Sequence, residues 1–153
     1  MHRPSREASL MQKVIEHHTL RGDFELSGGG RSDTYIDLRS AWLCRFCSDE
    51  MYGFYVTAIN RLLGYPHPTE VCIVGTGHFG AMTLATLRWR ENRLLWTPKG
   101  HGVEWSGQCD SAIGEAIIVD DVVTTGGTVE RLTAACEQRG LHVIGVVTAV
   151  PAR

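Results

Sequence analysis

The sequence has no long hydrophobic segment. No apolar stretch in its 153 residues approaches the roughly 20 that a membrane-spanning helix needs. The first residues carry charge but lead into no secretory hydrophobic region. We therefore expect a cytoplasmic protein that does not bind a membrane.

An excess of charge of one sign is also missing. Lys and Arg total 15 against 17 Asp and Glu, which gives a formal net charge of -2, and no run of Lys or Arg occurs. Nucleic acids attract extended basic surfaces, so this balance argues against a nucleic-acid partner. Any site for an anion must then be local.

Cysteine is sparse, with 5 residues scattered along the chain. Cys44 and Cys47 have the spacing of a redox pair or of half a zinc site, but no second pair lies at zinc-finger distance. The histidines His2, His17 and His18 show no spacing that indicates a metal either. We expect buried or incidental thiols, with these histidines on the surface or at helix ends.

Helical and strand patterns alternate along what we interpret as one domain, residues 1–153. Apolar spacing predicts helices over residues 5–18, 49–63, 81–90 and 129–139. Short apolar runs predict strands over residues 24–26, 35–38, 71–74, 94–96, 116–119 and 143–150. Residues 97–110 show no period and are expected to form a long, functional loop. Strand and helix in alternation predict an α/β fold with a parallel sheet and right-handed crossovers.

One strand leads directly into a candidate phosphate site. After Ile117–Val119 come Asp120 and Asp121, and then Thr124–Thr128, which holds three threonines and two glycines before a helix. Glycine lets the backbone approach a ligand closely, and free N–H groups at a helix start can hold a phosphate. The two acids suit sugar hydroxyls or a hydrated divalent cation. A sugar phosphate meets both requirements.

Simpler interpretations of these patterns fit less well. A capped turn with a tight glycine corner needs fewer polar residues than Asp-Asp followed by Thr-Thr-Gly-Gly-Thr. A Walker loop would require Gly-Lys-Ser or Gly-Lys-Thr, which is missing. Gly75–Gly80 fits the dinucleotide spacing Gly-x-Gly-x-x-Gly, but the acid expected about 20 residues later is replaced by Arg93–Trp96.

The segment Ile117–Thr128 resembles the phosphoribosyl pyrophosphate signature of type I phosphoribosyltransferases. Three further segments resemble the orotate branch of that family in order and spacing. Phe24–Arg39 is similar to its N-terminal substrate segment, Val74–Gly80 to its pyrophosphate loop, and Lys99–Gly102 to the Lys-x-His-Gly core of its mobile catalytic loop. The resemblance runs from Leu20 to Val150.

This resemblance implies a Rossmann-like phosphoribosyltransferase fold with a small N-terminal hood over residues 1–40. It also implies a pentosyltransferase of pyrimidine nucleotide biosynthesis, which transfers 5-phosphoribose from phosphoribosyl pyrophosphate to orotate. The products are orotidine monophosphate and pyrophosphate. Mg²⁺ is implied as cofactor, held mainly by the substrate, with Asp120 and Asp121 as candidate ligands through water. A homodimer is implied, in which the catalytic loop closes over the neighbouring subunit's site.

The family's site residues carry over onto matching positions. Lys99, His101, Asp120 and Asp121 match catalytic positions, and Lys99 and His101 would stabilise the leaving pyrophosphate. The donor-binding positions are Gly77, His78, Lys99, His101, Asp120, Asp121, Val122, Val123, Thr124, Thr125, Gly126, Gly127 and Thr128. The orotate-binding positions are Tyr35, Ile36 and Thr124, with Arg153 as a candidate one step beyond the family's arginine position.

Some positions depart from the family pattern. Leu95 and Trp96 replace an Arg-Lys pair, Phe79 replaces a basic residue of the pyrophosphate loop, and Ser27 stands where a lysine can occur. Each lost cation removes a charge-assisted phosphate contact worth roughly 1.5 to 3 kcal/mol. Two alternatives follow: a phosphoribosyltransferase for another base, or a nucleotide-binding relative with weak or no turnover.

Overall fold

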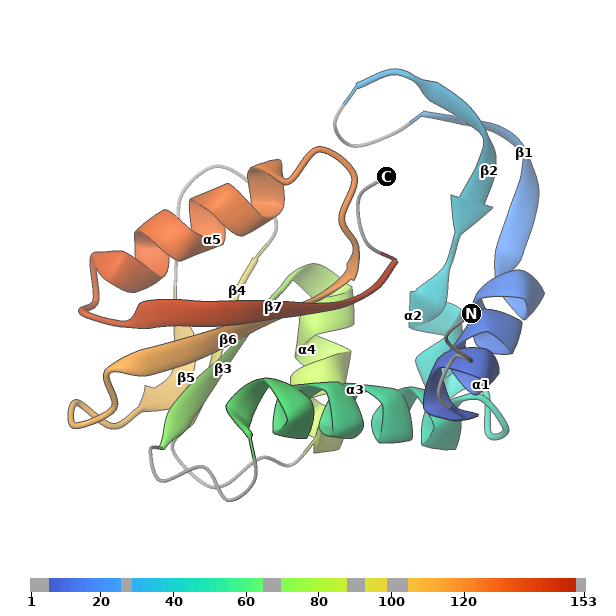
Figure 1. Cartoon of the computed structure of the whole chain (residues 1–153). Coiled ribbons are helices and arrows are strands. Elements are labelled where there is room, and N and C mark those ends of the chain that lie inside the picture. The colour runs from blue at the N-terminus through green and yellow to red at the C-terminus, as the bar shows by residue number, and fades with distance from the viewer. Residues whose placement is uncertain (1–5, 26–28, 65–69, 88–92, 99–104, 151–153) are drawn as a thin grey trace, which may run out of the picture. The chain divides into compact units, whose positions relative to one another are not determined.

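The structure, a computed structural model, describes residues 6–25, 29–64, 70–87, 93–98 and 105–150. Its backbone divides into two compact units, Met1–Thr57 and Ala58–Arg153. Figure 1 traces the elements of both along the chain.

The first unit combines helices with a two-stranded hairpin. Its elements are α1 (Arg6–His17), β1 (Thr19–Glu25), β2 (Arg31–Ile36), α2 (Leu38–Leu43) and the first part of α3 (Ser48–Leu63). β1 and β2 pair antiparallel, and the Arg31 guanidinium pairs with the Asp23 carboxylate between them. At the base of the hairpin, the Asp37 amide donates to the His18 carbonyl at 2.9 Å.

Helical spacing explains the small core of this unit. Met11 and Val14 lie one turn apart on α1 and are both buried. The other buried apolar residues of the unit are Leu38, Ala41 and Trp42 from α2, and Met51 and Tyr55 from α3. The rings of Trp42 and Tyr55 lie 6.2 Å apart between centroids, so α2 and α3 pack directly on each other.

The second unit is a five-stranded sheet with two crossover helices. Its elements are β3 (Val71–Thr76), α4 (Gly77–Leu87), β4 (Arg93–Thr97), β5 (Ser106–Cys109), β6 (Glu115–Val122), α5 (Gly127–Glu137) and β7 (His142–Val150), with the end of α3. The strand order is β5-β4-β3-β6-β7. All pairs are parallel except β4 with β5, which are antiparallel.

The strand order places a switch point at the centre of this sheet. From β3 the chain crosses through α4 to β4 on one side, and from β6 it crosses through α5 to β7 on the other. Because such crossovers are right-handed, α4 and α5 cover opposite faces of the sheet. The carboxyl ends of β3 and β6 therefore send their loops apart, which opens the crevice where ligands of α/β sheets bind.

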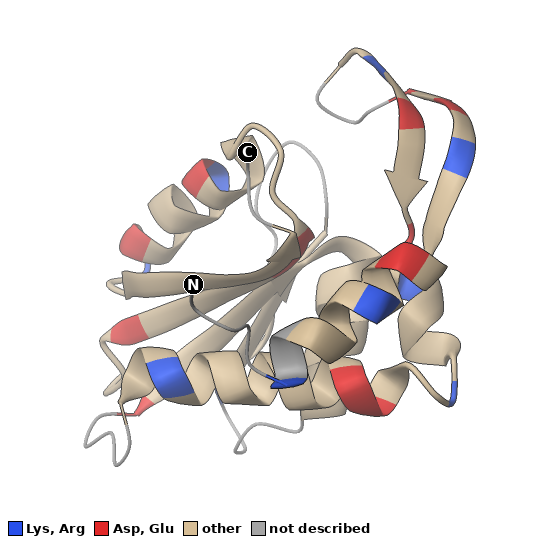
Figure 2. Cartoon of the chain, turned by 45° about the vertical axis from the view of Figure 1, so that its right-hand side comes forward, with Lys and Arg blue, Asp and Glu red and all other residues tan. Residues whose placement is uncertain are grey.

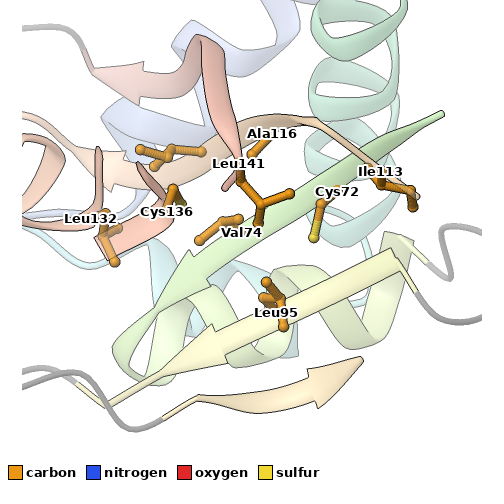
Figure 3. Packing of buried hydrophobic residues seen from close by; sticks show 9 residues of the cluster. Cys72, Val74, Leu95, Ile113, Ala116, Leu132, Cys136 and Leu141 are labelled. Carbon is orange, nitrogen blue, oxygen red and sulfur yellow. The ribbon is translucent and has the colours of Figure 1, made fainter. Parts of the chain in front are cut away.

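The main core lies between the sheet and α5 (Figure 3). Cys72, Val74 and Leu95 lie on the same face as Ala116 and Ile118, where they pack with residues of α5 and the following turn. Every residue of β3 is buried, as expected for a central parallel strand covered on both faces. At the far edge, Gly145 of β7 leaves room for Leu62 of α3, which a Cβ there would approach within 2.5 Å.

The cysteines of this unit are packing residues, as the sequence predicted. Cys72 and Cys136 are buried and Cys109 is half-buried. Burial raises the pKa of the Cys136 thiol to about 11 and also raises the pKa of Cys72. Both thiols therefore stay protonated near neutral pH and are poor nucleophiles.

The expected α/β class is confirmed, but the bounds of most elements differ from those expected, and the strand expected over residues 24–26 begins earlier, at Thr19. The strand expected over residues 35–38 ends at Ile36, and Leu38 instead begins α2. Part of the loop expected over residues 97–110 forms β5. The helix expected from Ala81 begins at Gly77, directly after β3.

Charged residues are distributed over many elements (Figure 2), and no element carries a long run of one sign. In the described ranges, no helix has the length and apolar character that crossing a bilayer demands.

Candidate functional site

The loop after β6 is the best candidate for a ligand site because it starts at the switch point. Val123 is its first residue, and its amide donates to the carbonyl of Val150 at the end of β7, at 2.9 Å. Thr124 and Thr125 are exposed. Gly126 follows with φ of 83°, a left-handed conformation that favours glycine. This residue turns the chain into α5.

Backbone N–H groups of this loop are available to a ligand. The first hydrogen bond of α5 runs from the Glu130 amide to the Gly126 carbonyl, at 2.9 Å. Within the ranges that the structure describes, the amides of Thr124–Thr128 have no hydrogen-bond partner, and no side chain caps α5. The start of a helix carries partial positive charge, so this loop can hold an anion without a basic side chain.

The two acids lie near the carboxyl end of β6, just before that loop. Asp120 is buried, with 8% of its surface exposed, and Asp121 is half-buried. The Asp120 carboxylate accepts the Asp121 amide at 3.0 Å, and the Asp121 carboxylate accepts the Val122 amide at 2.8 Å. These bonds fix both side chains at the carboxyl end of β6. The strand alternation directs Asp120 toward the α5 face and Asp121 toward the other.

A cation that the sequence reasoning missed lies beside this edge. Arg131 of α5 donates from Nη2 to the Thr76 hydroxyl at 3.5 Å, and its Nη1 is buried without a hydrogen-bond partner. The Thr76 hydroxyl in turn donates to the Thr97 carbonyl at 3.0 Å. Arg131 thus reaches from α5 to the ends of β3 and β4. The sequence shows that Arg131 lies one turn after the Gly-Gly-Thr segment. It does not show that the side chain points toward the end of β3.

The loop after β3 forms the other side of the crevice. Gly75 and Gly80 pack so closely that a Cβ on Gly80 would lie 2.7 Å from the Gly75 carbonyl carbon. Between them, Gly77 has φ of 62°, and its carbonyl accepts a hydrogen bond from the Trp96 indole at 2.8 Å. His78 is exposed at the start of α4. The glycine spacing therefore serves close backbone packing and a left-handed turn.

Three of the family's missing cations are replaced by residues with structural roles. Phe79 is 4% exposed and belongs to the core. Leu95 is fully buried, and Trp96 fixes the Gly77 carbonyl. The apolar side chains at these positions stabilise the loop that they border.

The predicted acceptor residues Tyr35 and Ile36 belong to β2 in the first unit. The Tyr35 hydroxyl accepts a hydrogen bond from Arg39 at 3.0 Å, and its ring lies 5.5 Å from that of Phe24. Arg39 also pairs with the Asp37 carboxylate at 3.1 Å. Tyr35 is thus held by its neighbours on the hairpin.

Three predicted site residues, Lys99, His101 and Arg153, lie outside the described residues. The remaining residues that the sequence predicts to bind the donor lie within the second unit. Asp120–Thr128 form one side of the switch point and Gly77 with His78 the other.

No family model matches the sequence. The sequence does match individual relatives. The chain is 32% identical over 145 residues to the orotate phosphoribosyltransferase of Aeropyrum pernix, which covers 89% of this chain and 74% of the relative. It is 32% identical over 127 residues to the enzyme of the same name from Cenarchaeum symbiosum, covering 80% of this chain and 62% of the relative.

Solved structures resemble the fold over nearly the whole chain. The orotate phosphoribosyltransferase of Aeropyrum pernix superposes with a TM-score of 0.65 at 26% identity, covering 92% of this chain and 78% of that one. UMP synthase of Leishmania donovani gives a TM-score of 0.73 at 20% identity, covering 94% of this chain and 31% of that one. An adenine phosphoribosyltransferase of Saccharomyces cerevisiae, at 15% identity, gives 0.65 with 94% of this chain and 89% of that one covered.

Proposed function

The chain belongs to the orotate phosphoribosyltransferase family, and we propose that it transfers 5-phosphoribose from phosphoribosyl pyrophosphate to orotate in pyrimidine nucleotide biosynthesis. The observation that carries this proposal is the set of amides at Thr124–Thr128 that have no hydrogen-bond partner in the described part of the chain, next to two carboxylates held by backbone hydrogen bonds. Few ligands other than a sugar phosphate use both.

The donor's 5-phosphate is held by the amides and hydroxyls of Thr124–Thr128. The start of α5 adds its positive partial charge to that contact. Asp120 and Asp121 accept hydrogen bonds from the ribose hydroxyls. They point to opposite faces of β6, so a ring that lies across the edge of the sheet contacts both.

Transfer breaks the bond between ribose C1 and the pyrophosphate oxygen, whose electron pair leaves with pyrophosphate. The N1 electron pair of orotate forms the new bond to C1, and the N1 proton is lost to solvent. Positive charge develops on the ribose, which the two acids stabilise, and negative charge grows on the leaving group. Arg131, Lys99 and His101 supply the cations for that leaving group.

The donor set at Asp120 and Asp121 also fits a magnesium ion. Carboxylate oxygens are the ligands that Mg²⁺ prefers, and it keeps several waters when substrate phosphates complete its shell. When bound, the ion neutralises part of the pyrophosphate charge. The carboxylates would hold it through water, and their own hydrogen bonds from the Asp121 and Val122 amides keep the two side chains in place.

A second candidate function, nucleotide binding without turnover, is favoured by the apolar residues at Phe79 and Trp96. Both take the place of phosphate-binding cations and are committed to structural contacts. The half-buried Arg131, whose Nη1 is buried, argues for turnover because it restores one positive charge beside the ends of β3 and β6. Assaying a panel of bases also tests whether the acceptor is a base other than orotate.

The decisive experiment mixes the protein with phosphoribosyl pyrophosphate, Mg²⁺ and orotate and follows the loss of orotate absorbance. We expect turnover by the native chain and a fall of about 100-fold or more in kcat/KM for Asp120→Asn with Asp121→Asn. Asp110→Asn is the matched control, because it changes an exposed acid and keeps the oxygen that accepts the Ala112 amide.

The outcomes separate the candidate functions. Turnover only with another base would replace orotate as acceptor. Donor binding by calorimetry without turnover on any base would support the binding module. An unchanged rate in the double variant would remove the ribose contacts from the mechanism.

A homodimer completes the proposal. In the family the loop that Lys99 and His101 match closes over the neighbouring subunit's site, so each site would take its cations from the partner. The test of this exchange belongs to the whole molecule and is given in the Discussion.

A further inference from the structure

A cluster of side chains that could hold a metal ion lies in the first unit. His18, Cys44 and Cys47 each offer a ligand atom, and these atoms lie within 4.8 Å of one another. His18 follows α1 directly, Cys44 follows α2, and Cys47 immediately precedes α3. Three separate elements therefore end or begin at the cluster.

A tight turn brings the two thiols together. The Cys47 amide donates to the Cys44 carbonyl at 3.1 Å, and the Ser48 amide donates to the same oxygen at 3.0 Å. The two sulfur atoms lie within 4.8 Å of each other. This is the backbone arrangement that lets a Cys-x-x-Cys pair hold one ion between its sulfur atoms.

The hydrogen bonds of His18 leave one ring nitrogen ready to bind a metal. The Ser40 hydroxyl has a single proton, which it donates to the Asp37 carbonyl at 2.8 Å. It must therefore accept its 2.7 Å hydrogen bond from His18, so the ring proton lies on Nδ1. His18 Nε2 then carries a free electron pair, and it is buried without a hydrogen-bond partner.

The hydrogen bond to Ser40 also holds the His18 ring in place. Metal-binding histidines commonly donate their second nitrogen to an oxygen, which fixes the tautomer and the ring orientation. His18 and Ser40 show that arrangement.

We propose that His18 Nε2 and the sulfur atoms of Cys44 and Cys47 bind one zinc ion, with water as the fourth ligand. Two thiolates balance the charge of Zn²⁺. Sulfur and imidazole are ligands that zinc prefers, whereas Mg²⁺ prefers oxygen ligands. Among the residues that the structure describes, no fourth His, Cys, Asp or Glu belongs to the group, which assigns the remaining position to water.

The present spacing needs only a small adjustment to accept the ion. A tetrahedral zinc with Zn–S of about 2.3 Å and Zn–N of about 2.0 Å separates its ligand atoms by roughly 3.5 to 3.8 Å. The ligand atoms now lie up to 4.8 Å apart, and rotation of a cysteine side chain closes the difference.

The ion would stabilise a unit whose own core is small. A segment of this size buries limited apolar surface, and metals often supply the missing stability. The cluster lies at the base of the β1–β2 hairpin, where the Asp37 amide meets the His18 carbonyl. Zinc there would fix the base of the hairpin that carries Tyr35 and Ile36.

The test uses the full chain, purified with a phosphine reductant and stripped of metal by a chelator. We expect it to bind one equivalent of Zn²⁺, with a rise in the melting temperature. Co²⁺ in place of Zn²⁺ should give the visible bands of a tetrahedral ion and a near-ultraviolet thiolate charge-transfer band. Cys44→Ser and Cys47→Ser should lose both the bands and the stabilisation.

Matched controls use neighbouring or equivalent residues outside the cluster. Cys109→Ser removes a half-buried thiol of the other unit, and His17→Ala removes the exposed histidine next to His18. Both should bind zinc as the native chain does. Ser40→Ala keeps all three ligands but frees the ring, and it should weaken zinc binding by roughly 10- to 100-fold. Circular dichroism verifies that each variant is folded.

Several results would overturn the proposal. One is a reduced, folded chain that takes up no stoichiometric metal. Another is cobalt bands that persist in Cys44→Ser and Cys47→Ser. A third is a Cys44–Cys47 disulfide found by mass spectrometry in a protein that binds no zinc once it is reduced, which would make the pair a redox element.

Discussion

The surroundings of the Arg131 side chain are those of a residue that binds a ligand. A guanidinium with a buried, unpartnered nitrogen is costly unless a charge completes its hydrogen bonds. Its other terminal nitrogen reaches Thr76 at the end of β3, next to the loop that the sequence predicts to contact pyrophosphate. The residue therefore supplies a positive charge that Phe79 and Trp96 do not.

Replacing Arg131 by Met keeps most of the side chain's length and removes its charge. We expect KM for phosphoribosyl pyrophosphate to rise by roughly 10- to 100-fold, because a hydrogen bond to a charged group contributes about 1.5–3 kcal/mol. Steady-state kinetics at varied donor concentration measures this. Arg131→Lys should recover part of the loss.

Arg139→Met is the control for that change. Arg139 follows the far end of α5, where its guanidinium lies 5.6 Å from the centroid of the Trp105 ring. Its replacement should leave KM for the donor unaltered. An equal effect of both substitutions would mean that general charge, and not the position of Arg131, attracts the donor.

At the scale of elements, the join between β3 and α4 depends on two glycines. A methyl group on Gly80 would lie 2.7 Å from the carbonyl carbon of Gly75. Gly80→Ala should therefore push the start of α4 away from β3 and lower the free energy of unfolding by about 1–3 kcal/mol. Denaturant titration measures the change.

Gly114→Ala is the matched substitution for that comparison. Gly114 lies in the turn before β6, and an added Cβ meets nothing within 4 Å. We expect a change of about 0.5 kcal/mol or less. Similar losses in the two variants would show that glycine content, and not the close packing of Gly75 on Gly80, determines the effect.

The sequence predicted the central elements because their patterns are decided locally. β3 and β6 are apolar runs buried on both faces, and the glycines and threonines after β6 mark the turn into α5. β5 was missed because this short edge strand is mostly exposed and is held by backbone pairing with β4. α2 was missed because six residues are too few to show a helical period.

The two candidate sites also differ in whether their residues are neighbours in the sequence. The residues of the phosphate loop are neighbours in sequence, so their pattern was visible. His18 lies 26 residues from Cys44, and only the packing of α1 against α2 brings them together. The expectation that His17 and His18 mark a helix end is confirmed, but the meeting of His18 with the thiols is a tertiary contact that no spacing rule could predict.

For the whole molecule, the central question is whether each active site takes residues from two chains. We expect a homodimer in which Lys99 of one chain serves the Asp120 and Asp121 of the other. Lys99→Ala and the double Asp→Asn variant should each be nearly inactive alone. Random mixing should restore roughly a quarter of the wild-type rate, since half of the dimers are mixed and each has one intact site.

Mixing must be preceded by partial unfolding and refolding so that the subunits exchange. Gel filtration with light scattering establishes the oligomeric state, and affinity capture through a tag on one of the two variants verifies that mixed dimers have formed. No recovery of activity in a verified mixed dimer would place Lys99 in the site of its own chain.

The hydrogen bond from the Trp96 indole to the Gly77 carbonyl has a practical consequence. An indole's emission depends on the polarity around its ring and on the bond that its N–H makes. Trp96 is thus an intrinsic fluorescent probe next to the loop after β3. A ligand that displaces the Gly77 carbonyl changes its fluorescence directly, which allows occupancy to be followed in real time without any label.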